Sequence, residues 1–199
     1  METEAKIKKA LLSLMEEKSF DKISVTNIVN EAKINRGTFY LHYFDKFDLI
    51  ESIENEIFNE IEQAIDKSFR INIEMVLNHV SKGLLESVLF NIYSAVEKHI
   101  DVIKILLSKN GSISTPYKLN NLFKKQLSKN ISMVLKIKKP QIPDDYIMAV
   151  ASSVHYSIIM EWINKENRES VDELVKIAAS IVYPVVTTIV LGRGIKNNK

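Results

Sequence analysis

The chain has 199 residues, 46% of them hydrophobic, and a formal net charge of +2. The absence of cysteine excludes disulfides, thiolate zinc sites and a cysteine nucleophile. The least polar stretches, 146–160 and 177–191, are shorter than the roughly 20 residues of a membrane helix. Because no basic-then-apolar leader opens the chain, we expect a cytoplasmic globular protein.

Three helices are predicted in the first 45 residues. Apolar residues recur at helical spacing over 3–18. Ser24 is suited to cap a short second helix, and Asn35 a third helix of little more than one turn. Two helices joined by a turn of about 3–4 residues form the helix-turn-helix that reads DNA. Ile34 and Phe39 are the expected core residues of the third helix.

The remaining side chains of the third helix predict contacts with DNA. Arg36 near its start is suited to a bidentate contact with guanine. Gly37 permits a close backbone approach, and Thr38 suits a phosphate or a thymine methyl group. Three further donors, which we expect to hold phosphates and so fix the register on the duplex, are Tyr40, His42 and Lys46.

The run Gly37-Thr-Phe-Tyr-Leu-His-Tyr-Phe-Asp-Lys46 and the preceding residues 28–35 resemble the DNA-binding domain of the TetR (tetracycline-repressor-like) family of bacterial regulators. The resemblance covers residues 5–50. It departs at Lys33, where the family usually has glycine, so we expect mild strain or a different turn geometry there. The resemblance and the residues together assign to DNA binding Ser24, Thr26, Lys33, Arg36, Gly37, Thr38, Tyr40, His42 and Lys46.

The rest of the chain also predicts helices and no sustained strand alternation. Asp45 is suited to cap a long helix whose apolar positions continue to Ile65, and further helices are expected at about 72–94, 97–108, 115–135, 144–164 and 170–191. The fold class is therefore all-α and TetR-like. We expect a three-helix DNA-binding domain at 1–47 and a helical regulatory and dimerisation domain at 48–199.

The last two predicted helices are apolar on nearly every side. A helix of this kind must be buried all round, and its own domain would cover one face only. We therefore expect a homodimer in which helices 144–164 and 170–191 meet their copies, as the TetR resemblance also implies. The run from Ile142 to Trp162 is similar to the regulatory domain of one TetR subgroup.

A regulatory domain of this family commonly holds a small effector in an apolar pocket with a few polar anchors. The candidate anchors are His79, Tyr93, His99, His155, Tyr156 and Trp162, each of which is also compatible with an ordinary core or surface position. The histidines form no metal-binding pair and no Gly-rich phosphate loop is present, so we expect no metal, no cofactor and no enzymatic activity.

Charge gives the DNA interpretation little support, since residues 1–50 contain eight basic and eight acidic residues. Between 102 and 143 there are nine lysines and no acidic residue. This run favours a solvated face, or alternatively a site for an anionic effector or more DNA.

The sequence as a whole predicts a ligand-responsive repressor that binds a palindromic operator as a homodimer. Two alternatives stay open. One is the same fold acting as an activator or as a nucleoid or cell-division factor. The other is a helical small-molecule-binding protein or enzyme that does not bind DNA.

Overall fold

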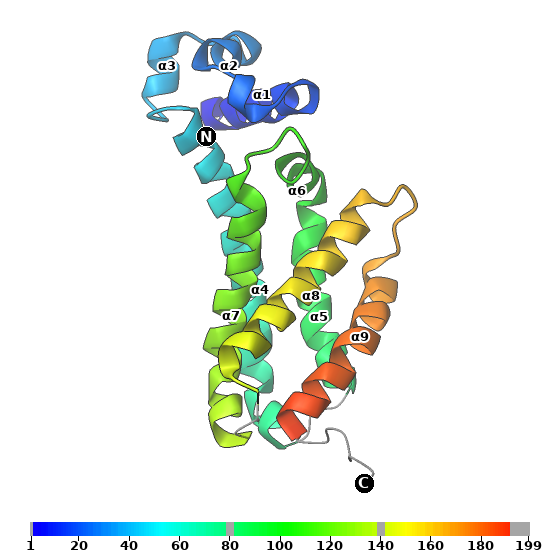
Figure 1. Cartoon of the computed structure of the whole chain (residues 1–199). Helices are drawn as coiled ribbons and strands as arrows, with labels where there is room; N and C mark the ends of the chain where they lie inside the picture. Colours follow the sequence, from blue (N-terminus) through cyan, green and yellow to red (C-terminus); the bar gives the residue numbers. More distant parts are fainter. Residues whose placement is uncertain (1, 79–81, 139–141, 192–199) are drawn as a thin grey trace. The chain divides into compact units, whose positions relative to one another are not determined.

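The computed structural model describes residues 2–78, 82–138 and 142–191, and within them every regular element is helical, which confirms the all-α prediction (Figure 1). The elements are α1 Glu2–Glu17, the 3₁₀ helix η1 Phe20–Lys22, α2 Val25–Ala32, α3 Arg36–Tyr40, α4 Lys46–Asn78, α5 Lys82–Lys98, α6 Ile100–Leu106, α7 Ser114–Lys138, α8 Asp144–Asn164 and α9 Val171–Leu191.

The prediction was wrong about where the long fourth helix ends. A new helix was expected at about 72, whereas α4 continues to Asn78 and α5 begins at Lys82. The stretch around residue 70 contains no glycine or proline that would end a helix. η1 was not predicted either. α9 continues through Pro184 without a break in the helix.

The chain divides into two compact units. One unit comprises residues 1–59 and 99–118, and the other comprises residues 60–98 and 119–199. The predicted DNA-binding helices thus share a unit with α6, the α6–α7 loop and the first turn of α7. Our prediction of a domain boundary after residue 47 is a separate statement about function, and it stays a prediction.

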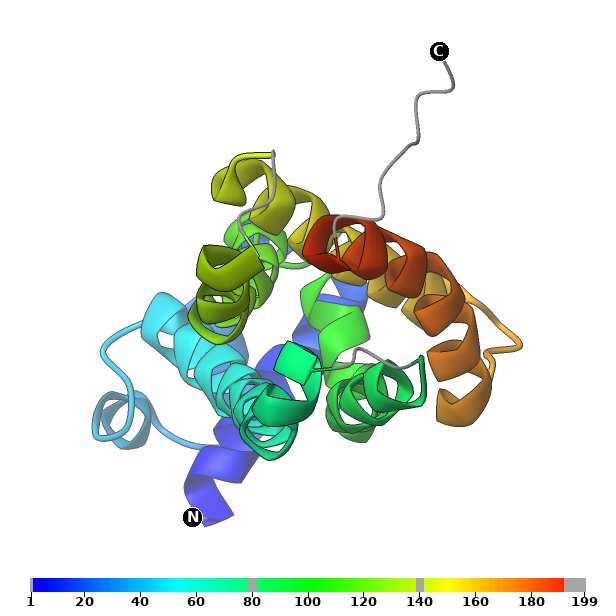
Figure 2. The ribbon, with the colours of Figure 1, turned by 90° about the horizontal axis from the view of Figure 1, so that it is seen from below.

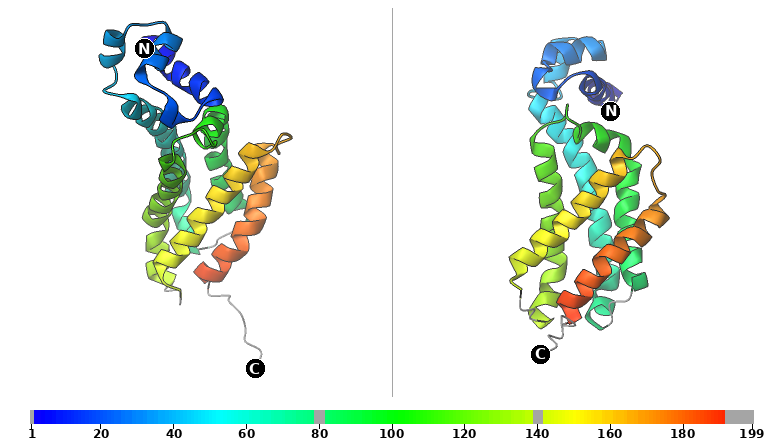
Figure 3. Two further views of the ribbon diagram at one scale, coloured as in Figure 1. Left: turned by 45° about the horizontal axis from the view of Figure 1, so that its top comes forward. Right: turned by 45° about the vertical axis from the view of Figure 1, so that its right-hand side comes forward.

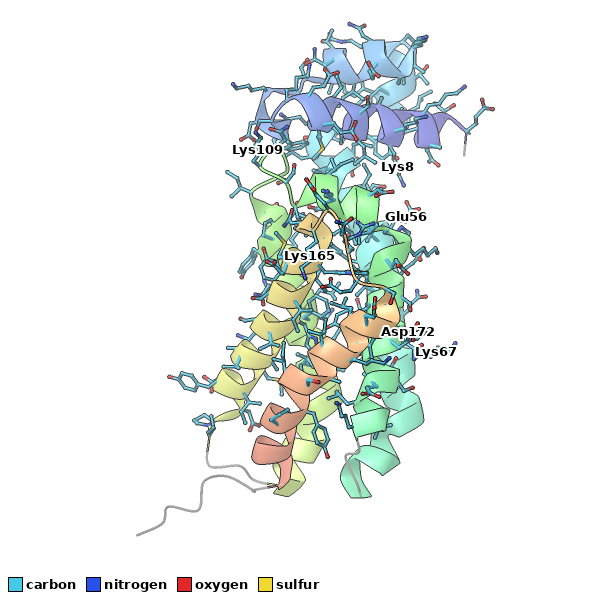
Figure 4. The ribbon with its side chains drawn as sticks, turned by 90° about the vertical axis from the view of Figure 1, so that its right-hand side faces the viewer. Lys8, Glu56, Lys67, Lys109, Lys165 and Asp172 are labelled. Carbon is cyan, nitrogen blue, oxygen red and sulfur yellow. The ribbon has the colours of Figure 1, made fainter. Side chains whose placement is uncertain are left out.

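The first unit has its core on the apolar face of α1. Ile7, Leu11 and Met15 are fully buried, at the helical spacing that the sequence predicts. α1 packs on α2 and on α6, and Figure 3 shows α1, α2 and α3 in two views. Lys8 on α1 donates to Glu56 on α4 at 2.6 Å (Figure 4).

A buried carboxylate joins α4 to α7 in this first unit. The Glu54 side chain is 1% exposed and accepts hydrogen bonds from Thr115 Oγ1 and from Lys118 Nζ. In the second unit, Lys129 of α7 pairs with Asp66 of α4 at 2.6 Å. Two of the nine lysines in the 102–143 run therefore find their counter-charges on α4 rather than in their own stretch of sequence.

The second unit is a bundle in which α9 packs against α5 and α8 lies beside α9 (Figure 2). Aromatic side chains occupy its interior, with Tyr93 from α5, Phe123 from α7 and Trp162 from α8 each no more than 2% exposed. None of the described helices is long and apolar enough to cross a membrane.

Candidate nucleic-acid interface

α2 begins at a complete capping box. The Asn27 backbone N–H donates to Ser24 Oγ at 3.2 Å, and the Ser24 N–H donates to Asn27 Oδ1 at 2.9 Å. Ser24 therefore caps α2 as predicted. This reciprocal pair satisfies two N–H groups that the first turn of a helix leaves without partners. The cap fixes the start of the helix that precedes the turn.

The turn after α2 has the left-handed geometry that usually favours glycine. Lys33 has φ 53° and ψ 46°, and among the described non-glycine residues no other has a positive φ. The N–H groups of Lys33 and Ile34 donate to Asn30 O and Val29 O, which closes the end of the helix. Of the two expectations for this turn, strain is therefore the one observed: Lys33 adopts the left-handed conformation, and its side chain is exposed.

α3 starts at Asn35, whose Oδ1 accepts from the Thr38 backbone N–H at 2.8 Å and from Thr38 Oγ1 at 3.1 Å. This cap also gives a reason for Gly37, because a Cβ there would lie 3.2 Å from Asn35 Oδ1. Phe39 is fully buried and anchors the helix. Ile34, the other expected core residue, is only half-buried.

Two of the predicted DNA-contact residues are brought together across the turn. Arg36 Nη2 donates to Thr26 Oγ1 at 2.5 Å, so the start of α3 is tied to the start of α2. Both side chains are exposed, as are Gly37 and Tyr40. The guanidinium group has five N–H donors, so the bond to Thr26 orients it and leaves it able to bind a further acceptor.

His42 and Lys46 differ in how they are held. His42 is exposed, with Nδ1 3.4 Å from Glu4 Oε1. Lys46 Nζ donates to three backbone carbonyls, of Phe20 at 2.9 Å, Asp21 at 3.0 Å and Ile23 at 2.8 Å. It also lies 4.7 Å from the centre of the Phe20 ring.

These contacts give Lys46 a structural role that the sequence does not predict, and its predicted phosphate contact stays a prediction. An ammonium group has three donors, and here two are directed at carbonyls of η1 and one at the carbonyl of Ile23, which follows η1. Lys46 therefore fastens the first turn of α4 to η1 and has no donor left for a phosphate in this structure. This also explains a lysine at a helix N-terminus, where the helix dipole disfavours it.

Two of the predicted effector residues are in contact with each other. Tyr93 and His155 meet in the core of the second unit, with the Tyr93 hydroxyl 3.3 Å from His155 Nδ1 and the Phe123 ring stacked on the imidazole at 6.0 Å. Burial lowers the pKa of His155 to about 4 and raises that of Tyr93. Both side chains are therefore neutral at pH 7.

The other candidates have different surroundings. Trp162 is buried, and its Nε1 donates to Glu169 O at 2.9 Å, which fixes the α8–α9 loop. Tyr156 is half-buried. His99 belongs to the first unit, where it directly precedes α6. His79 lies outside the described residues.

The face of α8 and α9 that turns away from this core carries a surface groove of about 550 Å³, to which Val150, Val154 and Ile158 of α8 and Ile181 of α9 contribute. A neighbouring depression of about 250 Å³ includes Ile177. Val150, Ile177 and Ile181 are 44–53% exposed.

Comparison with known proteins identifies the family. A family model described as the bacterial regulatory proteins of the tetR family matches residues 7–53, and one described as a transcriptional regulator C-terminal region matches residues 84–183. The chain belongs to the TetR family. This is a family of transcriptional regulators, and the N-terminal match covers α2, α3 and the turn between them.

Individual relatives of this TetR-family chain are distant. An uncharacterized HTH-type transcriptional regulator, YxbF, of Bacillus subtilis is 23% identical over 164 residues, which are 82% of this chain and 40% of that protein. The chain thus spans less than half the length of this curated relative.

Two of the solved structures that share its fold illustrate the similarity. A TetR regulator from Streptococcus agalactiae is 24% identical with a TM-score of 0.60, covering 91% of this chain and 93% of that one. A TetR-family regulator from Syntrophomonas wolfei is 17% identical with a TM-score of 0.66, covering 98% of each chain.

Two features of this TetR chain were missed because their partners are distant in sequence. Asn110 Nδ2 donates to Glu16 O at 3.3 Å, and the Phe20 N–H donates to Asn110 O at 2.8 Å, so the α6–α7 loop is bonded to the end of α1 and to η1. The buried Glu54 is the other. The Asn110-Gly111 pair predicts a turn, but it does not indicate which residues the turn contacts.

Proposed function

We propose that this chain is a cytoplasmic, ligand-responsive repressor that binds a palindromic operator as a homodimer. The observation that carries the proposal is the exposed, pre-ordered surface of α2 and α3. There the capped helices present Thr26, Arg36, Gly37 and Tyr40 outward, and Arg36 is already oriented by Thr26. Ordering a side chain before binding lowers the entropy that the complex must lose.

The contacts divide into two kinds. Arg36 and Thr38 at the start of α3 read base edges in the major groove, because these are the first turns to enter it. The residues that hold phosphates and set the register on the duplex are Thr26, Lys33, Tyr40 and His42. Ser24 contributes by capping α2, since its N–H and its hydroxyl both donate to Asn27 Oδ1. We leave Lys46 out of this set because its ammonium group is engaged with η1.

Dimerisation is supported by the outer face of α8 and α9. Its exposed Val150 and Ile181 line the 550 Å³ groove, and the exposed Ile177 lines the neighbouring depression. A large exposed apolar patch on a soluble protein is typical of a protein interface. A two-fold dimer would set two recognition helices about 34–36 Å apart on successive turns of DNA. The two DNA-binding domains of the dimer then bind the two half-sites together, and their affinities combine.

The effector is proposed from Tyr93 and His155, two polar side chains that meet at 3.3 Å in the mainly apolar core of the second unit. Neither group carries a charge at pH 7, so the pair suits an uncharged ligand with a hydroxyl or carbonyl group and not an anion. A ligand that binds one conformer of the bundle better shifts the population toward that conformer. We propose that the preferred conformer holds the operator less tightly.

The first test is footprinting on DNA upstream of the chain's own gene, combined with a reporter under that promoter. We expect a symmetric protected site and higher reporter output without the protein. Lower output without the protein would show an activator. Absence of any salt-dependent binding to selected DNA would contradict the whole proposal, since phosphate contacts impose a slope of roughly −0.9 per neutralised phosphate.

Dimerisation has its own test, by light scattering on the purified full chain. Ile181→Glu should give monomers and weaken operator binding, because it puts an unpaired charge in the proposed interface. Tyr117→Glu changes a 71% exposed residue of the other unit, and it should leave the dimer intact. A monomeric wild-type chain would contradict the interface.

A further inference from the structure

Large apolar side chains are exposed at the junction between α3 and α4. Figure 1 shows the chain passing from α3 into α4. Leu41 and Phe44 are each 84% exposed, and the neighbouring Tyr40 and Phe47 are 55% and 57% exposed. Scattered exposed apolar residues are ordinary, but a concentration within eight residues indicates a binding surface. This junction directly follows the recognition helix.

Polar groups at the same junction are occupied within the protein. Asp45 Oδ1 accepts from the N–H groups of Phe47 at 2.8 Å and Asp48 at 2.9 Å, and Asp48 Oδ2 accepts from the Phe44 N–H at 2.8 Å. Lys46 is committed to three carbonyls. Beyond the phosphate contacts proposed for Tyr40 and His42, the junction therefore presents mainly apolar groups to a partner.

Leu41 continues the outward face of the recognition helix. Its N–H donates to Gly37 O at 3.1 Å, so the two residues lie one turn apart on the same side. Gly37 is exposed and has no side chain, which leaves Leu41 as the projecting group of that side. A duplex that contacts Arg36 and Gly37 would meet Leu41 next.

We propose that Leu41 and Phe44 form an apolar contact with operator DNA, packing on deoxyribose carbons and thymine methyl groups beside the bases that Arg36 reads. The inference rests on the proposed function. It also gives a source of DNA affinity to residues 1–50, which have no net charge because they contain eight basic and eight acidic residues. Apolar contact supplies affinity that a neutral domain does not gain from counterion release.

Salt dependence separates this contact from a phosphate contact. The probe is a duplex selected by the wild-type chain from a randomised pool, followed by fluorescence anisotropy at several salt concentrations. Leu41→Ser and Phe44→Ser should each weaken binding by about tenfold. The slope of log affinity against log salt should stay unchanged, because no phosphate contact is lost.

Matched variants and a modified duplex complete the experiment. Phe90→Ser changes a 41% exposed phenylalanine of the second unit and should bind as wild type, and Phe44→Tyr should retain affinity. Replacing thymine by uracil in the duplex should reproduce part of the Leu41→Ser loss where the methyl group is the contact, and none of it where deoxyribose is.

Three results would overturn the inference. They are unchanged affinity in both serine variants, a slope reduced by about one phosphate, or a change in oligomeric state at unchanged DNA affinity, which would assign the patch to a second copy of the chain. Failure of the wild-type chain to select any duplex would instead overturn the proposed function, and this inference with it.

Discussion

A substitution at Lys46 distinguishes a lysine that stabilises the fold from one that binds a DNA phosphate. Its ammonium group makes two part-buried hydrogen bonds and one exposed one to the carbonyls at η1. Buried hydrogen bonds to charged groups contribute about 1.5–3 kcal/mol each, and exposed ones less. Because one side chain makes all three, we expect Lys46→Met to lower the free energy of unfolding by about 3 kcal/mol.

This loss corresponds to a melting temperature lower by roughly 6–12 °C for a chain of this size. Calorimetry or urea unfolding measures it, and Lys22→Met is the matched control because Lys22 is an exposed lysine of η1. The salt slope of operator binding, measured well below the melting temperature, should not change. An unchanged melting temperature together with a slope smaller by about 0.9 would refute our reasoning and restore Lys46 as a phosphate contact.

Three further outcomes test other parts of the structure by urea unfolding. Lys33→Gly should stabilise by about 0.5–1 kcal/mol, since it relieves the φ of 53°; a loss of stability would show that the turn is not left-handed. Unfolded His155 takes up a proton near pH 6.5 and the folded residue near pH 4. The free energy of unfolding should therefore fall by about 2 kcal/mol from pH 7.5 to pH 5. The double variant Tyr93→Phe, His155→Phe should lose this pH dependence, and a variant that retains it would contradict the assignment to His155. Gly111→Ala should destabilise the chain by more than about 2 kcal/mol, because the new Cβ would lie 2.0 Å from Leu106 O. Gly83→Ala is the control and should not destabilise the chain, because its Cβ would meet nothing within 4 Å. Equal effects of the two substitutions would contradict both placements.

The helix caps could be predicted from the sequence because their chemistry is local. Ser24, Asn35 and Asp45 each accept hydrogen bonds from N–H groups no more than three residues away. The burial of Phe39 and of the α1 face follows from helical spacing in the same way. Such features depend on neighbours that the sequence places side by side.

The roles of Lys46 and Asn110 could not be predicted, because their partners are far away along the chain. Lys46 reaches carbonyls 23–26 residues earlier, and Asn110 reaches Glu16 across 94 residues. The sequence shows Lys46 only as a positive charge near the recognition helix, and a phosphate is the natural partner to infer. The fold provides a different one.

The extent of α4 shows the same limit in another form. A change of element was predicted near residue 70 although no proline or glycine stands there, and the helix runs on to Asn78. Continuous helical pattern without a breaker is evidence for continuation. The pairing of Asp66 with Lys129 likewise depends on which helices become neighbours, which periodicity does not specify.

The central claim is that the exposed face of α2 and α3 binds operator DNA. Its most direct test is the affinity of the full chain for a duplex that the wild type selects from a randomised pool. We expect tight, salt-dependent binding by the wild type, and a loss of at least tenfold in Arg36→Ala, Tyr40→Phe, in line with about 1–3 kcal/mol for a bidentate guanine contact. Unchanged melting would show that this double variant is folded. Equal affinity of wild type and variant would contradict the account.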